Sequence, residues 1–283
     1  MNDPYLAPFA LKWNPFSPAV PIEALLATVA VEHFLRRIEK TQLGEGGFAL
    51  ITGEPGIGKS VVLRLLAERL QQLPELEVGA LARPQGNLAD FYRELGDLFS
   101  VPLRPHNRWA GSKTLRERWQ HHFEATLVRP VLLIDEAQEM SPSVLNELRL
   151  LASARFDSRV LLTVVLAGDA RLTEKLRQED LLPLGSRIRI RLALEPATPA
   201  ELLACLRHLC AAAGNPNLMT PALMQTLSEH ALGNRRVLVN TAAELLAAGA
   251  ERSLAQLDEQ LYLALVGAPR PAPRHPAVER RRA

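Results

Sequence analysis

The sequence predicts an α/β fold, in which a parallel five-stranded sheet is covered by helices and followed by a small unit of helices alone. Up to residue 195, short apolar runs of strand length alternate with helical segments, which is typical of a parallel sheet with right-handed crossovers. From residue 196 onward the pattern is helical. The chain is 47% hydrophobic and 23% charged, and these globular values argue against wholesale disorder and against a collagen or disulfide scaffold.

The chain begins with a proline-rich segment. Residues 1–21 contain five prolines with large apolar side chains between them, so we expect an extended apolar arm that lies on another part of the protein. A helical pattern over 22–40 follows and ends at a run of glycines. We therefore divide the chain into an arm at 1–21, an α/β core at 22–195, an α-helical lid at 196–266 and a Pro/Arg-rich disordered tail at 267–283.

Five strands are expected in the core, each short and apolar enough to be buried in a sheet. They are predicted at 48–52, 78–82, 131–134, 160–166 and 188–194. Core helices are expected at 59–73, at two or three places within 87–128, and after Ser141, which precedes Pro142 as an N-cap residue. Lid helices are expected at 198–213, 221–232 and 236–252.

A glycine-rich turn follows the first predicted strand. Residues 53–60 read GEPGIGKS and match the phosphate-binding pattern GxxxxGK[ST], with a strand before it and a helix after it. The glycines let successive N–H groups converge on phosphate oxygens, and the start of the helix adds its positive dipole end. Lys59 is expected to contact the β- and γ-phosphates, and a chance glycine-rich turn is the alternative. The expected nucleotide contacts are Gly53, Glu54, Pro55, Gly56, Ile57, Gly58, Lys59, Ser60 and Val61.

An acidic pair, Asp135 and Glu136, ends the predicted strand at 131–134. Open α/β sheets bind ligands at the carboxyl ends of their strands. We therefore expect Asp135 and the Ser60 hydroxyl to hold Mg²⁺, and Glu136 to polarise a water molecule in line with the γ-phosphate. An ordinary helix N-cap is the alternative for such a pair. Combined with the glycine-rich turn, the pair predicts a catalytic site that binds Mg-ATP and hydrolyses it.

Five segments occur in an order that resembles the AAA+ ATPases, namely GEPGIGKS, VLLIDEAQEM, LLTVVLAGDARL, GSRIRIRL and GNRRVLVN. More narrowly, the chain is similar to the ExeA-like and TnsC-like group, whose members include transposition regulators and a secretion-associated ATPase. The opening FALKWNPF also resembles the start of that group, and the similarity covers residues 9–265. The resemblance implies a three-layer P-loop NTPase sandwich with a C-terminal helical lid.

The resemblance also implies roles for residues outside the two motifs. Asp169 matches a polar sensor of the γ-phosphate, although the group more often has a neutral Gln or Asn nearby. Arg187 matches an arginine finger that reaches the ATP of a neighbouring subunit; Arg189 is the register alternative, and a solvated edge strand is the alternative for these arginines. Arg236 matches a lid arginine that senses the γ-phosphate, with Arg235 as the register alternative. A finger supplied in trans implies an ATP-dependent homo-oligomer, either a ring or a short helical filament.

Two aromatic segments are candidates for further ligand contacts. The resemblance suggests that Trp13 and Phe16 of the arm cover the adenine, and packing under the first helix is the alternative. Residues 104–122 hold five basic side chains together with Trp109 and Trp119, which suits contact with DNA phosphates. A surface helix with core tryptophans is the alternative there. The arginines of the predicted tail would contact DNA or an acidic partner, or simply aid solubility.

Several observations bear on the compartment. The longest apolar stretch, at 160–167, is far shorter than the roughly 20 residues that cross a bilayer. The N-terminus has no cationic region before an apolar core, so no signal peptide is expected. Cys205 and Cys210 lack metal-ligand spacing and are expected in the core or at its boundary. We therefore expect a cytoplasmic protein without a membrane partner.

Three functions are compatible with these patterns. The first is an ATPase of a mobile element that assembles on double-stranded DNA and recruits or activates a transposase. The second is a secretion-associated ATPase similar to ExeA, which we rank lower because we expect such proteins to carry a membrane segment and a wall-binding domain after the ATPase. The third is a nucleotide-gated scaffold without significant turnover. The carboxylate of Glu136 counts against the scaffold, because a pure switch does not need to activate water.

Overall fold

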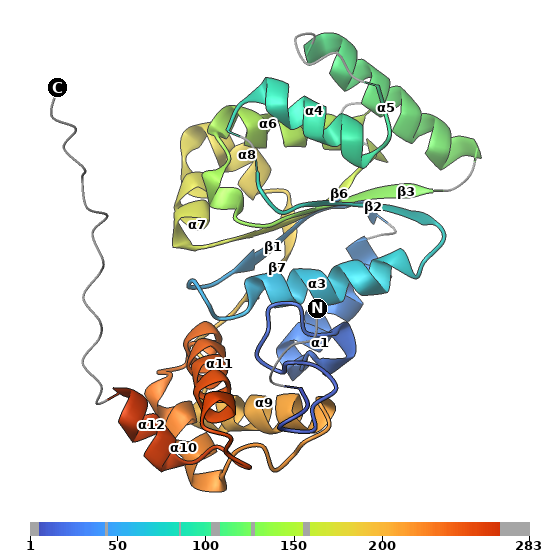
Figure 1. The fold of residues 1–283 in the computed structure, drawn as a ribbon. Helices are drawn as coiled ribbons and strands as arrows, with labels where there is room; N and C mark the ends of the chain where they lie inside the picture. Colours follow the sequence, from blue (N-terminus) through green and yellow to red (C-terminus); the bar gives the residue numbers. More distant parts are fainter. Residues whose placement is uncertain are drawn as a thin grey trace, which may run out of the picture.

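The computed structural model describes residues 6–42, 45–84, 86–102, 108–125, 128–154 and 159–266. The predicted tail at 267–283, residues 1–5 of the predicted arm, and Arg104 lie outside the described residues. In Figure 1 an α/β body lies above a body made of helices, and the N-terminal segment runs between the two.

The sheet is parallel and five-stranded, as predicted. Its strand order is β2-β3-β6-β1-β7, and all four neighbouring pairs are parallel. The carboxyl ends of the five strands therefore meet at one end of the sheet. The strands are β1 (Gly47–Thr52), β2 (Leu76–Leu81), β3 (Arg129–Ile134), β6 (Thr163–Gly168) and β7 (Ile188–Ala193). A short antiparallel pair, β4 (Ser153–Ala154) and β5 (Arg159–Val160), is separate from this sheet.

Helices cover both faces of the sheet and give three layers (Figure 1). Alternate residues of each central strand point to opposite faces. In β1, Ala49 and Ile51 pack with α1 and α3, whereas Phe48 and Leu50 belong to the apolar cluster that includes α4 to α8. The helices are α1 (Val29–Arg37), α3 (Lys59–Gln71), α4 (Leu88–Leu98), α5 (Arg108–Ala125), α6 (Pro142–Ala152), α7 (Ala170–Arg177) and α8 (Leu182–Gly185).

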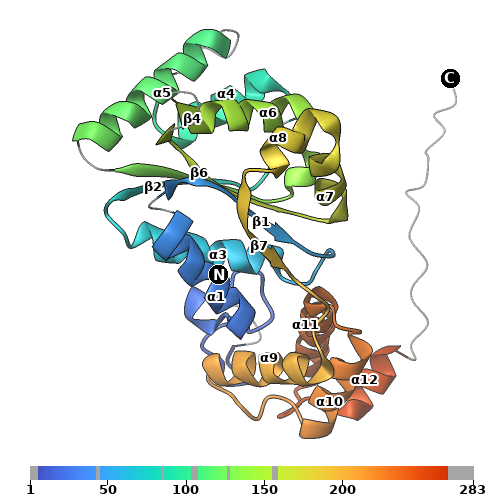
Figure 2. The same cartoon turned by 180° about the vertical axis from the view of Figure 1, so that it is seen from behind.

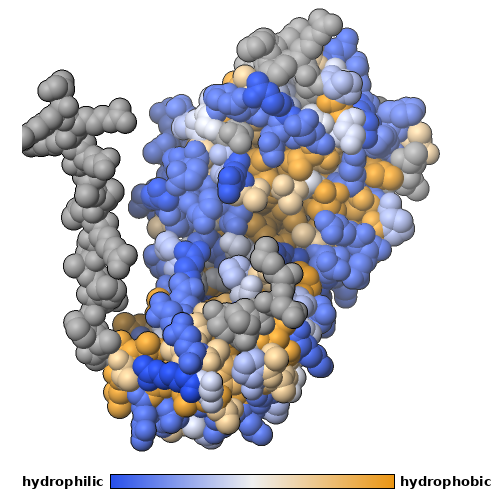
Figure 3. All heavy atoms as spheres, in the orientation of Figure 1, coloured by the Kyte–Doolittle hydropathy of each residue, from blue (hydrophilic) through white to orange (hydrophobic). Residues whose placement is uncertain are grey.

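Within residues 196–266, the second body contains four helices, whose apolar core also includes side chains of the arm. Its first helix begins with a capping box, in which the Thr198 hydroxyl accepts a hydrogen bond from the Glu201 N–H and the Glu201 carboxylate accepts one from the Thr198 N–H. Apolar surface is exposed around its last helix, where Leu263 and Val266 are 67% and 65% exposed (Figure 3). The helices are α9 (Pro199–Ala212), α10 (Pro221–His230), α11 (Arg235–Glu251) and α12 (Glu259–Val266), and α12 was not predicted as a separate helix.

Two predicted elements are divided differently in the structure. The predicted start of the strand at 160–166 is wrong, since β6 begins at Thr163, opposite Gly47. The N–H of Leu161 donates to the Ala152 carbonyl instead of pairing in the sheet. The helix predicted at 22–40 is a 3₁₀ turn, η1 (Ile22–Ala24), followed by α1. Thr28 is extended and its hydroxyl accepts a hydrogen bond from the N–H of Val31, so α1 begins there.

The described part of the arm, residues 6–20, is a succession of turns rather than an extended segment. Side chains set these turns, since the Asn14 amide oxygen accepts a hydrogen bond from the N–H of Phe16. Phe9 and Phe16 are 2% and 3% exposed and belong to the apolar core of the helical body. Lys12 also donates its N–H to the Ala213 carbonyl. The arm therefore lies on the lid helices, although it precedes the sheet in sequence.

Candidate nucleotide-binding site

The glycine-rich turn joins the end of β1 to the start of α3 and requires its glycines. Gly56 and Gly58 have φ angles of +86° and +112°, which favour glycine. A Cβ atom added to Gly56 would lie 2.4 Å from the Asn234 side-chain oxygen. Because the turn ends at the first residue of α3, the free N–H groups of the helix N-terminus face the same place as the turn.

Lys59 is 5% exposed and its side chain crosses the turn. Its ammonium donates hydrogen bonds to the carbonyl oxygens of Gly53, at 2.9 Å, and Glu54, at 3.1 Å. The next residue, Ser60, is exposed at the cavity described below. The ammonium and the hydroxyl therefore project from adjacent positions at the start of α3.

The acidic pair lies at the same end of the sheet. β3 is separated from β1 by β6 alone, so the two strand ends are about 10 Å apart at the usual strand spacing. Glu136 has a left-handed backbone, with φ +49°, and its N–H donates to the Asp135 carboxylate at 2.9 Å. Glu136 lines the same cavity as residues 56–62, so this part of the turn and the second acidic residue face one space.

Gln138 joins this site, although no role was predicted for it. It is 3% exposed, its side-chain N–H₂ donates to the Glu136 carboxylate, and its side-chain oxygen accepts from the Asp169 N–H at 3.3 Å. A Cβ atom on Gly168 would approach that oxygen to 2.7 Å, so glycine there leaves room for the amide. The sequence signal that could have identified Gln138 is a side-chain amide two residues after Glu136. The amide fixes the direction in which the Glu136 carboxylate points.

Asp169 follows β6 and caps α7. Its carboxylate accepts hydrogen bonds from the backbone N–H and the side chain of Arg171, both at 2.9 Å. Burial raises the pKa of the Asp169 carboxyl, but the hydrogen bonds and charge of Arg171 outweigh it and hold that pKa below its usual value. The structure thus shows a capping and ion-pairing role, and contact with a γ-phosphate stays a prediction.

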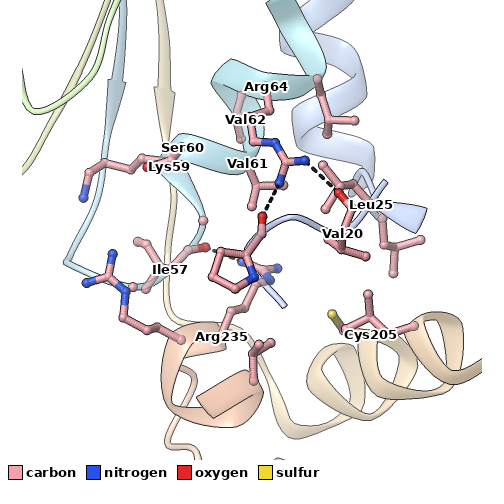
Figure 4. A pocket seen from close by; sticks show the side chains of 18 of the residues that line it. Val20, Leu25, Ile57, Lys59, Ser60, Val61, Val62, Arg64, Cys205 and Arg235 are labelled. Carbon is pink, nitrogen blue, oxygen red and sulfur yellow. Dashed lines mark hydrogen bonds between the residues drawn. The ribbon is translucent and has the colours of Figure 1, made fainter. Parts of the chain in front are cut away.

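A cavity of about 360 Å³ lies between the start of α3, the N-terminal arm and the lid (Figure 4). One end is polar and includes Gly58, Lys59 and Ser60. The other end is apolar and is lined by side chains of the arm, α1, α3 and the lid, among them Phe16, Val20, Leu25, Val31, Leu65, Leu209 and Val239. A cavity of this size with one polar and one apolar end suits a ligand that carries phosphates and a base.

The lid contacts the glycine-rich turn directly. Asn234 donates from its side-chain amide to the Pro55 carbonyl at 2.9 Å, and Arg236 donates its backbone N–H to the Gly56 carbonyl at 3.0 Å. The Arg235 guanidinium donates to the Ile57 carbonyl at 2.6 Å. Arg235 and Arg236 both line the cavity, so the choice between them as the phosphate-sensing residue stays open.

Arg187 lies far from the cavity of its own chain. It precedes β7, which lies beside β1 (Figure 2), and the first residue of β7, Ile188, is level with Phe48 at the start of β1. The glycine-rich turn begins five residues later, so about 17 Å of strand separates the two places. Arg187 donates to the Pro183 carbonyl at 2.7 Å, and Arg189 pairs with Glu45. None of the β7 arginines reaches the cavity in the described part of the chain.

The two tryptophans of α5 have different environments. Trp119 is fully buried and packs edge-on against Phe99, with ring centroids 5.3 Å apart. Trp109 is 72% exposed, and the Lys113 ammonium lies 5.2 Å from its ring centroid. Trp119 is therefore a core anchor, whereas Trp109 is exposed beside Lys113, whose ammonium lies 3.7 Å from the Glu117 carboxylate.

The two thiols are unpaired and sheltered from solvent. Burial raises the pKa of Cys205, and it raises the pKa of Cys210 to about 12, so both stay protonated near neutral pH. Within the described ranges, no group of three or more acidic, cysteine or histidine side chains is arranged to hold a metal ion. No helix in the described part of the chain is long and apolar enough to span a bilayer.

Comparison with known proteins agrees with this geometry. Residues 42–176 match a family model described as an AAA domain. The general secretion pathway protein A of Aeromonas hydrophila is 38% identical over 198 residues, which make up 68% of this chain but 35% of that protein. The chain therefore spans about a third of the length of this curated relative.

Solved structures share the fold at low identity. The ORC2 protein of Aeropyrum pernix, in ADPNP–ADP complexes, superposes with a TM-score of 0.72 and 16% identity over 90% of this chain and 70% of that one. The ORC1 protein of the same organism, in complex with DNA, superposes with a TM-score of 0.65 and 17% identity. This superposition covers 89% of this chain and 68% of that one. Residues 56–60 of the turn and Glu136 line one cavity, the chain has the α/β fold of P-loop NTPases, and residues 42–176 are similar to an AAA domain.

Proposed function

We propose that this chain binds ATP with Mg²⁺ and hydrolyses it as a homo-oligomer. The observation that carries the proposal is the cavity shared by the glycine-rich turn, the start of α3 and Glu136. A phosphate-binding turn alone would suit a protein that only binds nucleotide. A carboxylate held at the polar end of the same cavity adds the group that hydrolysis requires.

Each polar group has a distinct task in this proposal. The N-terminus of α3 and the Lys59 ammonium bind the phosphates. The Ser60 hydroxyl and the Asp135 carboxylate are oxygen donors at the same end of the sheet, which is the donor set that Mg²⁺ prefers, and they would hold the ion with water completing its shell. The bound ion would neutralise charge on the phosphate oxygens. Glu136, held by the Gln138 amide, orients the attacking water and accepts its proton.

The arginine finger belongs to a neighbouring subunit. Because about 17 Å of strand separates Arg187 from the turn of its own chain, a charge-neutralising role requires a second copy. A hollow on the side of the turn next to α7 is lined by two carboxylates and one guanidinium, those of Glu54, Glu174 and Arg177, and this excess of negative charge would attract a further guanidinium. Lid arginines, Arg236 or Arg235, complete the site from the same chain.

Two partner classes are candidates, and each has a supporting observation. The exposed Trp109 and Lys113 on α5 suit a nucleic acid, as expected for an ATPase that assembles on double-stranded DNA and activates a transposase. The relative from A. hydrophila is named for general secretion and supports the secretion-associated alternative. We keep the DNA-dependent ATPase as the first proposal and place it in the cytoplasm, where two unpaired thiols are expected to persist.

Measurement of ATP turnover tests these assignments. We expect Lys59→Ala to abolish ATP binding, and Glu136→Gln to keep ATP binding while losing turnover. ATP turnover that rises with double-stranded DNA, and rises less at higher salt, would support the DNA-dependent role. A rate of ATP turnover that does not change when DNA is added would favour the secretion-associated role. A purified protein with no affinity for ATP would refute the whole proposal.

A further inference from the structure

The N-terminal arm closes the apolar end of the nucleotide cavity. Pro15, Phe16, Ser17, Pro18 and Val20 all line it. The arm is held on the lid side by the hydrogen bond from Lys12 to Ala213 and by its buried phenylalanines. Across the described ranges, the hydrogen bonds that join residues 15–20 to the α/β body all come from one side chain, that of Arg64.

Arg64 points from α3 toward the arm (Figure 4). Its two terminal nitrogens donate to the carbonyl oxygens of Pro18, at 3.1 Å, and Val20, at 2.7 Å. A guanidinium is a planar fork with several donors, so it can hold two carbonyl groups two residues apart, whereas an ammonium is a compact point charge. No ion pair of Arg64 is found in the described part of the chain, so these backbone contacts account for its position.

The same helix serves both ends of the cavity. Lys59 and Ser60 begin α3 at the phosphate end, and Arg64 follows five residues after Lys59, about 7.5 Å further along the helix axis. A helix of 13 residues is a stiff connection. The position of the arm over the base end is therefore set relative to the phosphate-binding end by Arg64.

We propose that Arg64 is a positioning residue for the base of the nucleotide. It holds residues 15–20 as the wall against which the base packs, and it leaves the phosphate contacts untouched. The inference rests on the proposed function, since it assigns the apolar end of the same cavity to a base. The inference divides the affinity for ATP into a contribution from the phosphates and one from the base. The phosphates bind α3 and the turn, whereas the base depends on the arm.

Comparison of two ligands tests this separation. Isothermal titration of the full chain with Mg-ATP measures both ends of the cavity, and titration with inorganic tripolyphosphate measures the phosphate end alone. We expect Arg64→Ala to weaken ATP binding by about tenfold or more, because two hydrogen bonds from a charged donor are lost. Tripolyphosphate binding should stay within about twofold of the wild type, and the difference should also show as reduced discrimination between ATP and tripolyphosphate.

Two further variants serve as controls. Arg64→Lys keeps the charge but not the fork, and should fall between the wild type and Arg64→Ala. Arg93→Ala removes an exposed arginine of α4 that pairs with Asp90, and should change neither affinity. Circular dichroism confirms that each variant is folded, which is expected because Lys12 and Phe9 still hold the arm on the lid.

The outcomes distinguish the inference from the function on which it rests. Equal losses for ATP and tripolyphosphate, or no loss for either, would overturn the role of Arg64 while leaving the phosphate site in place. A wild-type protein that binds tripolyphosphate and ATP equally would show that no base is recognised. A wild-type protein that binds neither would overturn the proposed function itself.

Discussion

Mixing two inactive variants tests whether catalysis is shared between subunits. Glu136→Gln removes the water-activating carboxylate but keeps Arg187, and Arg187→Ala does the reverse. The register of β7 against β1 puts Arg187 about 17 Å from the turn of its own chain, so neither variant can complete its own site. Arg187→Ala alone should lose about a thousandfold or more in turnover, the usual contribution of an arginine finger, and Glu136→Gln alone should also lose turnover.

The structure predicts the size of the rescue. An active interface needs an intact site from an Arg187→Ala subunit and an intact finger from a Glu136→Gln subunit. Random mixing at equal amounts gives this pairing at about one quarter of head-to-tail interfaces. Turnover per subunit should therefore approach about 25% of the wild type and fall off on both sides of the equal ratio.

The assay is steady-state phosphate release at constant total protein, over a series of mixing ratios. A matched series with Arg189→Ala in place of Arg187→Ala decides the register, because only the true finger variant is inactive alone and rescued in the mixture. A flat line at background activity for both series would refute the proposal that either arginine acts in trans. Substantial activity of Arg187→Ala alone would remove that residue from the mechanism.

Three other predictions concern residues at or near the carboxyl end of the sheet. Gln138→Ala should lower kcat by about tenfold while leaving the Kd for ATP unchanged, because it releases the Glu136 carboxylate without removing a phosphate contact. Stopped-flow binding measures the Kd, and steady-state turnover measures kcat. Gly56→Ala should raise the Kd for ATP, since alanine in this left-handed backbone costs about 1–2 kcal/mol and the new Cβ would lie 2.4 Å from the Asn234 side-chain oxygen. Gly86→Ala is the control, because a Cβ there meets no atom within 4 Å, and it should leave the Kd unchanged. Asp169→Ala should destabilise the fold by about 1 kcal/mol at neutral pH. Because the folded-state pKa of Asp169 is lowered, its stabilisation is complete above the unfolded-state value of about 3.9 and is lost as the pH falls through the lowered value, so thermal melts of the two proteins should converge in acid.

The sequence predicted the sheet and the two motifs because those features depend on neighbours along the chain. Apolar runs such as 131–134 are buried on both faces and have the period of a strand. It predicted the boundaries less well where a single side chain decides them. The hydroxyl of Thr28 starts α1, and the backbone contact of Leu161 with Ala152 delays the start of β6. Such contacts depend on atoms brought together by the fold.

In the candidate site, too, the residues set by sequence neighbours were predicted and those set by contacts in the fold were not. Spacing identified Lys59, Asp135 and Glu136, since each follows a strand at a fixed distance. Spacing did not identify Gln138, because its role depends on two partners, the Glu136 carboxylate and the Asp169 N–H, that follow different strands. Arg64 was also missed, since its partners are 44 and 46 residues earlier in the chain. The domain boundaries, the oligomer and the lid sensor stay predictions.

Two cations beside the cavity bind neutral carbonyl oxygens rather than carboxylates. Lys59 and Arg235 donate to neutral carbonyl oxygens of the glycine-rich turn. Elsewhere, Arg69 and Arg171 pair with carboxylates, whereas Arg187 also donates to a carbonyl oxygen. A triphosphate that enters the cavity therefore has to draw two cations from neutral acceptors rather than break ion pairs, and a bond to a charged oxygen is stronger than one to a carbonyl. This exchange would favour a polyanion, which supports the proposal that the polar end of the cavity binds phosphates.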